Sequence, residues 1–266
     1  LGYSSAPQTV ADFRVQTCAA NASFRKDYDR SNDGIGGWII SSDADTLFSW
    51  LNVQDALDLT TAPEKFNNTK TRTAFIYLFN LQANACAWSS RLPEPYDYFA
   101  TRQALVYSGT TQDIIPQIAA FKRAENEDDW QVMAYPSEEG GIITNGLSYG
   151  IFKTDGKRQL AAWLFIRWLS DPSNQARLLQ TSGSLPLGTD VLDEMSAYED
   201  SYPEWKKALA LLDNVETIPA DANTGMVRMV LEDAGTFLFR AEFAADKVGE
   251  LLAQLDQTIR ELKEYE

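Results

Sequence analysis

The sequence predicts an α/β fold in which short strands alternate with helices and a helical C-terminal region packs on the sheet. Some apolar runs have strand length and are bounded by Gly or Pro, whereas other segments repeat apolar residues with the 3.6-residue period of a helix. Of the 266 residues, 44% are hydrophobic and 12% are aromatic, which is enough apolar surface for a core and excludes a disordered chain.

The first half of the chain carries most of the expected strands. Thr9 is the expected N-cap of the first helix, and Asp43 or Asp45 is the expected N-cap of the second. A further helix is expected over 71–86, and another begins at Thr110. Strands are expected at 36–41, 103–108 and 131–135, followed by a β-rich passage over 142–153.

The second half is mainly helical. A strongly apolar helix is expected over 158–170, and Asp171 with Pro172 forms an N-cap and a first helical position for the next one, which ends at Gly183. Later helices are expected at 203–212, 226–243 and 248–262. The last of these spans too few heptads for a coiled coil, so we expect it to face the core.

Charge and residue usage exclude several classes of function. The chain has 23 Lys and Arg against 38 Asp and Glu, and this net charge of −15 disfavours a nucleic-acid binder. Histidine is absent, which excludes Ser-His-Asp triads and His-ligated metal sites. The longest apolar run, 160–166, is much shorter than the roughly 20 residues that cross a bilayer. No metal site and no cofactor are expected.

Two motifs that resemble catalytic sites have simpler interpretations. Residues 146–150 match G-x-S-x-G, the nucleophile motif of α/β-hydrolases, but no His is present to activate Ser148 and Tyr149 continues as strand. The acidic clusters 125–129 and 138–139 lie in loops without an apolar setting, so we expect them to be solvated.

The segment Thr110, Thr111 and Gln112 is a candidate binding site, because backbone amides and polar side chains at a strand-to-helix junction line the crevice where α/β proteins bind small molecules. The competing interpretation is that a Thr merely caps the helix. Four aromatic residues are candidates for stacking on a sugar ring or, alternatively, for the core: Trp38, Trp50, Trp88 and Tyr149.

Cys18 and Cys86 are the only cysteines, and neither belongs to a C-x-x-C motif. From the residues alone they are either two buried thiols or a disulfide.

The segment 158–177 closely resembles a recurrent stretch of the extracellular solute-binding proteins of ABC importers, family 1, which includes maltose- and glycerol-3-phosphate-binding proteins. Residues 178–187 continue this resemblance with its Gly and Leu-Pro ending. Residues 6–13 are similar to the family's Pro-x-Thr-Trp-x-x-Phe opening, with Val10 in place of Trp, and 84–88 and 99–104 resemble its middle.

The resemblance implies a periplasmic-binding-protein-like fold of type II, with two α/β lobes and a hinge. Family members carry a complete first lobe ahead of the matching segment. By this resemblance, residues 1–140 and 192–266 form the C-terminal lobe and 141–191 are a remnant of the N-terminal lobe. The chain is then either a fragment or a natural short form.

The resemblance also implies a set of ligand-binding residues. Arg228 either pairs with a phosphate or carboxylate of the solute or forms a structural ion pair with Asp45. An exported setting favours the Cys18–Cys86 disulfide. The residues implied to lie at the cleft or near the hinge are Asp43, Asp45, Trp50, Thr110, Thr111, Gln112, Asn145, Ser148, Tyr149, Met226 and Arg228.

The implied function is capture of a carbohydrate or sugar-phosphate-like solute outside the cell, by cleft binding and lobe closure. The implied partners are that solute and the permease subunits of an ABC transporter, with a periplasmic or lipoprotein location. Two alternatives are a His-free, carboxylate-based glycoside hydrolase and a structural or adhesive surface domain. Without a first lobe, the apolar residues of 160–166 lose their cover, so we expect self-association or poor order there.

Overall fold

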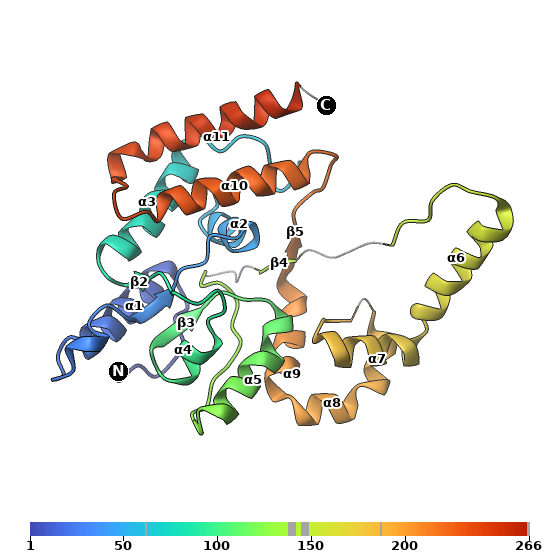
Figure 1. The fold of residues 1–266 in the computed structure, drawn as a ribbon, viewed down its shortest axis with the longest axis horizontal. Helices are drawn as coiled ribbons and strands as arrows, with labels where there is room; N and C mark the ends of the chain where they lie inside the picture. The colour runs from blue at the N-terminus through green and yellow to red at the C-terminus, as the bar shows by residue number, and fades with distance from the viewer. Residues whose placement is uncertain (62, 138–141, 145–148, 187, 265–266) are drawn as a thin grey trace.

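A three-stranded parallel sheet with the order β2-β1-β3 organises the chain in the computed structural model (Figure 1), which describes residues 1–61, 63–137, 142–144, 149–186 and 188–264. The central strand aligns Ile39 with Trp88 on one side and with Tyr107 on the other. All four residues of β1 are buried, as expected of a central parallel strand. The strands are β1 (Gly36–Ile39), β2 (Ala87–Trp88) and β3 (Ala104–Tyr107).

Helices from both ends of the chain enclose the main core, in which Trp38, Phe75 and Leu252 are fully buried. In Figure 1, α10 and α11 lie together over α2 and α3, although nearly 200 residues separate them in sequence from α2. The helices of this part are α1 (Val10–Phe24), α2 (Ala44–Asn52), α3 (Thr69–Ala83), α10 (Thr224–Leu238) and α11 (Val248–Lys263).

A second apolar cluster joins α5 to α7, α8 and α9 through residues that include Ile114, Leu179 and Trp205. The predicted boundary at residue 191 therefore falls inside a shared core, because Val191 is fully buried in the same cluster. The division into 1–140, 141–191 and 192–266 remains a prediction. The remaining helices are α4 (Tyr96–Ala100), α5 (Ile114–Arg123), α6 (Gly156–Leu169), α7 (Pro172–Ser182), α8 (Ser196–Ser201) and α9 (Pro203–Ala210).

A separate pair of parallel strands, β4 (Ile142–Thr144) and β5 (Val215–Thr217), flanks the part of the chain that holds α6 to α9. The strand predicted over 131–135 is wrong, since only Tyr135 makes an isolated bridge. Trp130 and Val132 pack against helical clusters instead of a sheet face. Of the β-rich passage predicted over 142–153, residues 142–144 form β4 and 149–153 have no regular structure, while 145–148 lie outside the described residues.

Local capping signals were predicted correctly. Thr9 caps α1 with a capping box, Asp43 caps α2, and Asp171 caps α7 with Pro172 in its first turn. Gly183 ends α7 in the left-handed conformation, at a φ of 70°. The helix predicted over 71–86 ends earlier, at Ala83, and the chain then enters β2.

Cys18 of α1 and Cys86, next to β2, form the disulfide that the resemblance implies. It links the helix that covers β1 to an outer strand of the sheet.

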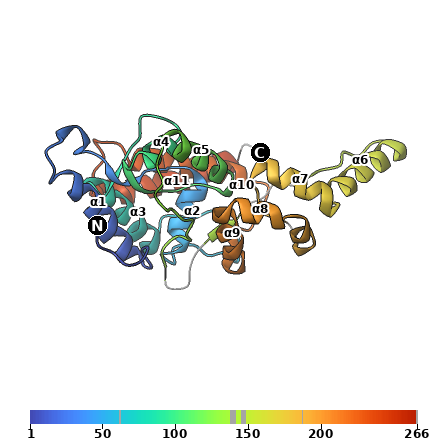
Figure 2. The ribbon, with the colours of Figure 1, turned by 90° about the horizontal axis from the view of Figure 1, so that it is seen from below.

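The helix α6 projects from the body of the molecule in both ribbon views (Figures 1 and 2). Over its length, all of which the structure describes, no side chain is buried. Trp163 and Leu164 are each 49% exposed, and Leu160, Phe165 and Trp168 are more exposed still. The apolar face of α6 is therefore exposed, as predicted. Among the described residues, no helix is long and apolar enough to span a membrane.

Reduction of the disulfide is expected to lower the free energy of unfolding by about 4 kcal/mol, because a cross-link over 68 residues restricts the unfolded chain. Urea unfolding with and without reductant measures this. A Cys18→Ser, Cys86→Ser double variant is the control and should be insensitive to reductant. Equal stability of the wild type in both conditions would contradict the expectation.

Self-association through α6 remains a prediction, and Leu164→Glu tests it. We expect the wild-type chain to dimerise with rising concentration and the variant to stay monomeric, because a carboxylate in an apolar contact is costly. Light scattering after gel filtration gives the mass. Leu92→Glu is the matched control, since Leu92 has the same exposed fraction, 49%, as Leu164. A wild type that is monomeric at every concentration would refute the prediction.

Candidate functional site

The loops that follow β1 and β3 meet at the carboxyl edge of the sheet. The two strands are parallel and adjacent, with Ile39 level with Tyr107, so the next residues of each lie side by side. The chain passes from β1 to β2 on one side and then crosses to β3 on the other. In α/β proteins, ligands commonly bind at the edge where the strand order reverses in this way. The crevice expected here is the space between the loops 40–43 and 108–112.

Asp43 shapes the loop after β1 by capping α2. Its carboxylate accepts hydrogen bonds from the Thr46 amide at 2.9 Å and the Thr46 hydroxyl at 2.6 Å, and Ser41 donates to it as well. Asp43 is itself exposed. Asp43, predicted to lie at the cleft, is therefore also the N-cap of α2, and its negative charge stabilises the N-terminus of that helix.

Thr110 shapes the loop after β3 in a similar way. The Asp113 carboxylate accepts from the Thr110 amide at 2.6 Å and from its hydroxyl at 3.1 Å, and Tyr96 donates to the other oxygen at 2.5 Å. The capping interpretation of this segment is confirmed, because Thr110 caps a short 3₁₀ turn, Thr111–Asp113, that precedes α5. The binding role of Thr110, Thr111 and Gln112 remains a prediction. Gln112 donates to Ser184 at 3.4 Å.

Partly buried polar contacts connect β1, α2 and the loop after β3 at this edge. The Trp38 indole donates to Ser108 at 3.2 Å, and the Tyr135 hydroxyl donates to Thr46 of α2 at 3.3 Å. Burial raises the pKa of Tyr135 to about 12, while its hydrogen bonds with Ser108 and Thr46 oppose that rise. The phenol therefore stays neutral and bridges β3 and α2.

Arg228 of α10 pairs with Asp45 of α2 at 2.8 Å, and the two side chains are 28% and 34% exposed. Of the two roles left open for Arg228, the structure shows the ion pair with Asp45. The pKa of Arg228 is raised first by this hydrogen bond, and the charges of Asp45, Glu232 and Asp43 act in the same direction. The single cation therefore lies among three carboxylates.

Trp50 is a correction to the predicted site. Its side chain is 1% exposed and lies in the main core, with ring centroids 4.9 Å from Phe13 and 5.3 Å from Tyr135. It follows Leu47 by three residues, which places it on the inward face of α2. A ring so buried presents no face to a sugar. Trp38, fully buried, is excluded for the same reason.

The remaining candidates differ in exposure, and Trp88 at the end of β2 is half-buried. Met226 is half-buried against the main core, and Tyr149 is exposed in an irregular segment. Asn145 and Ser148 lie outside the described residues.

Several polar residues at this edge were not predicted: Ser42, Ser108, Tyr135, Glu232 and Thr236. Two signals were available for four of them. Ser42 directly follows one expected strand and Ser108 ends another, and Glu232 and Thr236 follow Arg228 at successive four-residue steps of a helix. The role of Tyr135 depends on a contact over 89 residues, which no local pattern shows.

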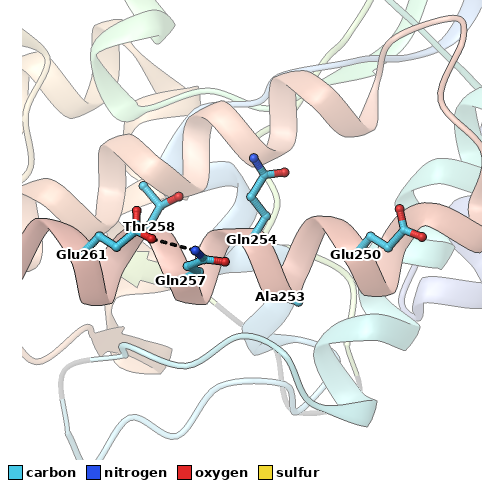
Figure 3. Close-up of a pocket in the computed structure, with 6 residues that line it drawn as sticks. All are labelled: Glu250, Ala253, Gln254, Gln257, Thr258 and Glu261. Carbon is cyan, nitrogen blue, oxygen red and sulfur yellow. Dashed lines mark hydrogen bonds between the residues drawn. The ribbon is translucent and has the colours of Figure 1, made fainter.

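A shallow depression on α11 is not a comparable site (Figure 3). Side chains of that helix alone line it, among them Glu250, Gln254 and Glu261, and no second element converges on it. Within the described ranges, no group of three or more His, Cys, Asp or Glu could hold a metal ion.

Alkaline pH is expected to destabilise the fold through the tyrosines at this edge. Folding raises the pKa of Tyr135 from 10.0 to about 12. The neutral phenol therefore contributes its full share to the free energy of unfolding below pH 10, and this share is lost as the pH rises to 12. Burial raises the pKa of Tyr77 and Tyr107 as well. Each such tyrosine lowers the free energy of unfolding by at most ~1.4 kcal/mol for each unit of rising pH.

Urea unfolding at pH 9, 10 and 11 measures this slope, and Tyr135→Phe should make it shallower. Tyr28→Phe is the control, because Tyr28 is fully exposed. An unchanged slope in Tyr135→Phe would contradict the assignment.

The fold is similar to several solved structures. MalE, a sugar-binding protein of Xanthomonas citri, matches with a TM-score of 0.74 and 20% identity over 98% of this chain and 66% of that chain. UgpB of Mycobacterium tuberculosis, solved with glycerophosphocholine, matches with a TM-score of 0.69 and 15% identity over 98% of this chain and 65% of that one.

The cyclic alpha-maltosyl-1,6-maltose binding protein of Arthrobacter globiformis matches with a TM-score of 0.68 and 15% identity, over 97% of this chain and 66% of that chain. These likenesses confirm the predicted periplasmic-binding-protein-like α/β fold. The chain spans about two thirds of the length of each structure. No curated protein sequence matches it.

The family model described as bacterial extracellular solute-binding protein matches residues 4–214, which is most of the chain. This description agrees with the predicted extracytoplasmic location. Because the match covers most of the chain, it shows that the chain belongs to the bacterial extracellular solute-binding protein family.

Proposed function

We propose that this chain is part of the solute-binding component of an ABC importer, and that it binds a carbohydrate and releases it unchanged. The observation that carries the proposal is the gathering of polar groups at the crevice between β1 and β3, in a chain of the extracellular solute-binding family. Similar structures include proteins that bind maltotriose and maltotetraose. The permease subunits of the importer are the proposed protein partners.

The polar groups bordering the crevice suit a hydroxyl-rich solute. Sugar hydroxyls both donate and accept hydrogen bonds. Thr111 and Gln112 follow β3 and offer side chains that do both, and Asp43 on the loop after β1 offers a carboxylate. Thr110, Asp45 and Arg228 complete the proposed site. Since Trp38 and Trp50 are buried, hydrogen bonds rather than stacking on these two rings supply the specificity.

A neutral sugar fits this edge better than a sugar phosphate. Arg228 is the cation that a phosphate would need, yet it is paired with Asp45, and Asp43 and Glu232 surround it. A phosphate would therefore have to displace a carboxylate and approach two others. Within the predicted range of solutes, we accordingly propose the neutral carbohydrates.

Isothermal titration of the chain with maltotriose, maltotetraose, tagatose and glycerophosphocholine tests this proposal. We expect binding of at least one sugar, none of glycerophosphocholine, and no new products by chromatography. Absence of binding by every sugar would refute the function, and sugar cleavage would favour the hydrolase alternative. Tight binding of glycerophosphocholine alone would refute the preference for neutral solutes.

Gln112→Leu should weaken sugar binding about tenfold, equivalent to ~1.4 kcal/mol, because a hydroxyl of the solute loses its partner. The matched control is Gln254→Leu, which alters an exposed glutamine on α11. Equal affinity of the two variants would remove Gln112 from the site.

A further inference from the structure

Three polar side chains on one face of α10 contact the end of the loop after β1 and the first turn of α2. Arg228, Glu232 and Thr236 follow one another at four-residue intervals, so they form a single row along the helix. Arg228 pairs with Asp45 at 2.8 Å, Glu232 accepts from the Ala44 amide at 3.1 Å, and the Thr236 hydroxyl lies 3.2 Å from that of Ser42.

The row runs antiparallel to the loop, because later residues of α10 contact earlier residues of the segment 42–45. Each contact links residues more than 180 positions apart. The junction between this loop and α2 is thus held by a helix from the other end of the chain.

Helix α10 packs closely against α2 and the loop before it at Gly235. A Cβ atom on Gly235 would lie 2.6 Å from a methyl group of Leu47 and 3.2 Å from the Cβ of Ser42. The backbone of α10 therefore approaches the loop as closely as it can. Buried Val227, Leu231 and Leu238 anchor the helix in the main core at the same time.

The row also completes the N-terminus of α2. The first amides of a helix have no partner within it, and Asp43 supplies one for Thr46. Glu232 supplies the partner for Ala44, a residue that is itself fully buried. Removal of the Glu232 acceptor would leave this amide without a partner in the structure, at a helix end that borders the crevice.

We infer that α10 positions the solute-binding loop and that Glu232 is a positioning residue, which sets solute affinity by holding Ala44 rather than by contacting the solute. This inference rests on the proposed function for its effect on affinity. The local effect on the loop does not depend on it.

Substitutions of Glu232 separate positioning from general stability. Glu232→Gln retains an oxygen that accepts from Ala44, whereas Glu232→Leu does not. Asp233→Leu is the matched control, since Asp233 is the next residue of α10 and is exposed. Thr236→Val, which removes only the contact to Ser42, provides a milder second variant.

Two readouts are required on the full chain: hydrogen exchange of the Ala44 amide by NMR, and the Kd for maltotriose by titration. In Glu232→Leu we expect Ala44 to exchange at least tenfold faster and the Kd to rise about tenfold. In Glu232→Gln both should stay within threefold of wild type, and Asp233→Leu should change neither. Thr236→Val should speed exchange over 42–45 to a smaller extent.

Unchanged exchange at Ala44 in Glu232→Leu would overturn the inference, as would faster exchange with an unchanged Kd. If Glu232→Leu does not fold, unchanged exchange over 42–45 in Thr236→Val overturns it. If the wild type does not bind maltotriose, the proposed function fails for that sugar, while faster exchange at Ala44 still supports positioning by α10.

Discussion

Burial of Trp38 in the central strand is the constraint on which the rest of the structure depends. Its ring contacts Phe13 of α1, Trp50 of α2 and Phe239 after α10, so one side chain joins three helical layers. Its indole N–H donates to Ser108 at the end of β3. The same residue thereby fixes the apolar core and one border of the crevice, and the disulfide ties α1 to the neighbouring strand.

The crevice combines local and long-range structure. Asp43 and Asp113 are local caps that any strand-to-helix junction can form. The contacts from α10 and Tyr135 are different, because they bring residues 89 to 194 positions away to the same edge. The shape of the proposed site therefore depends on assembly of the whole body. Helix α10 also follows β5 closely in the chain. Through its contacts with residues 42–45, α10 therefore connects this edge of the sheet to β4 and β5, which flank α6 to α9.

Sequence patterns predicted what short-range physics determines. The caps at Thr9, Asp43 and Asp171 and the end of α7 at Gly183 follow from hydrogen bonds within a few residues. Trp50 was misplaced because an amphipathic pattern shows that one face of α2 is buried, but not how much of a large ring stays exposed at its margin. The strand over 131–135 failed because apolar alternation does not reveal whether a helix or a sheet covers it. The partner of Arg228 could be named only as one of two alternatives, since the choice requires the packing of α10 on α2.

The central claim is that a neutral carbohydrate binds where β1 and β3 end. Backbone NMR of the isotopically labelled chain during titration with maltotriose tests it most directly, because every amide reports separately. The claim predicts saturable shifts confined mainly to 41–45 and 108–112, with little change along α11. Shifts that cluster on α11, or none at millimolar sugar, would contradict it.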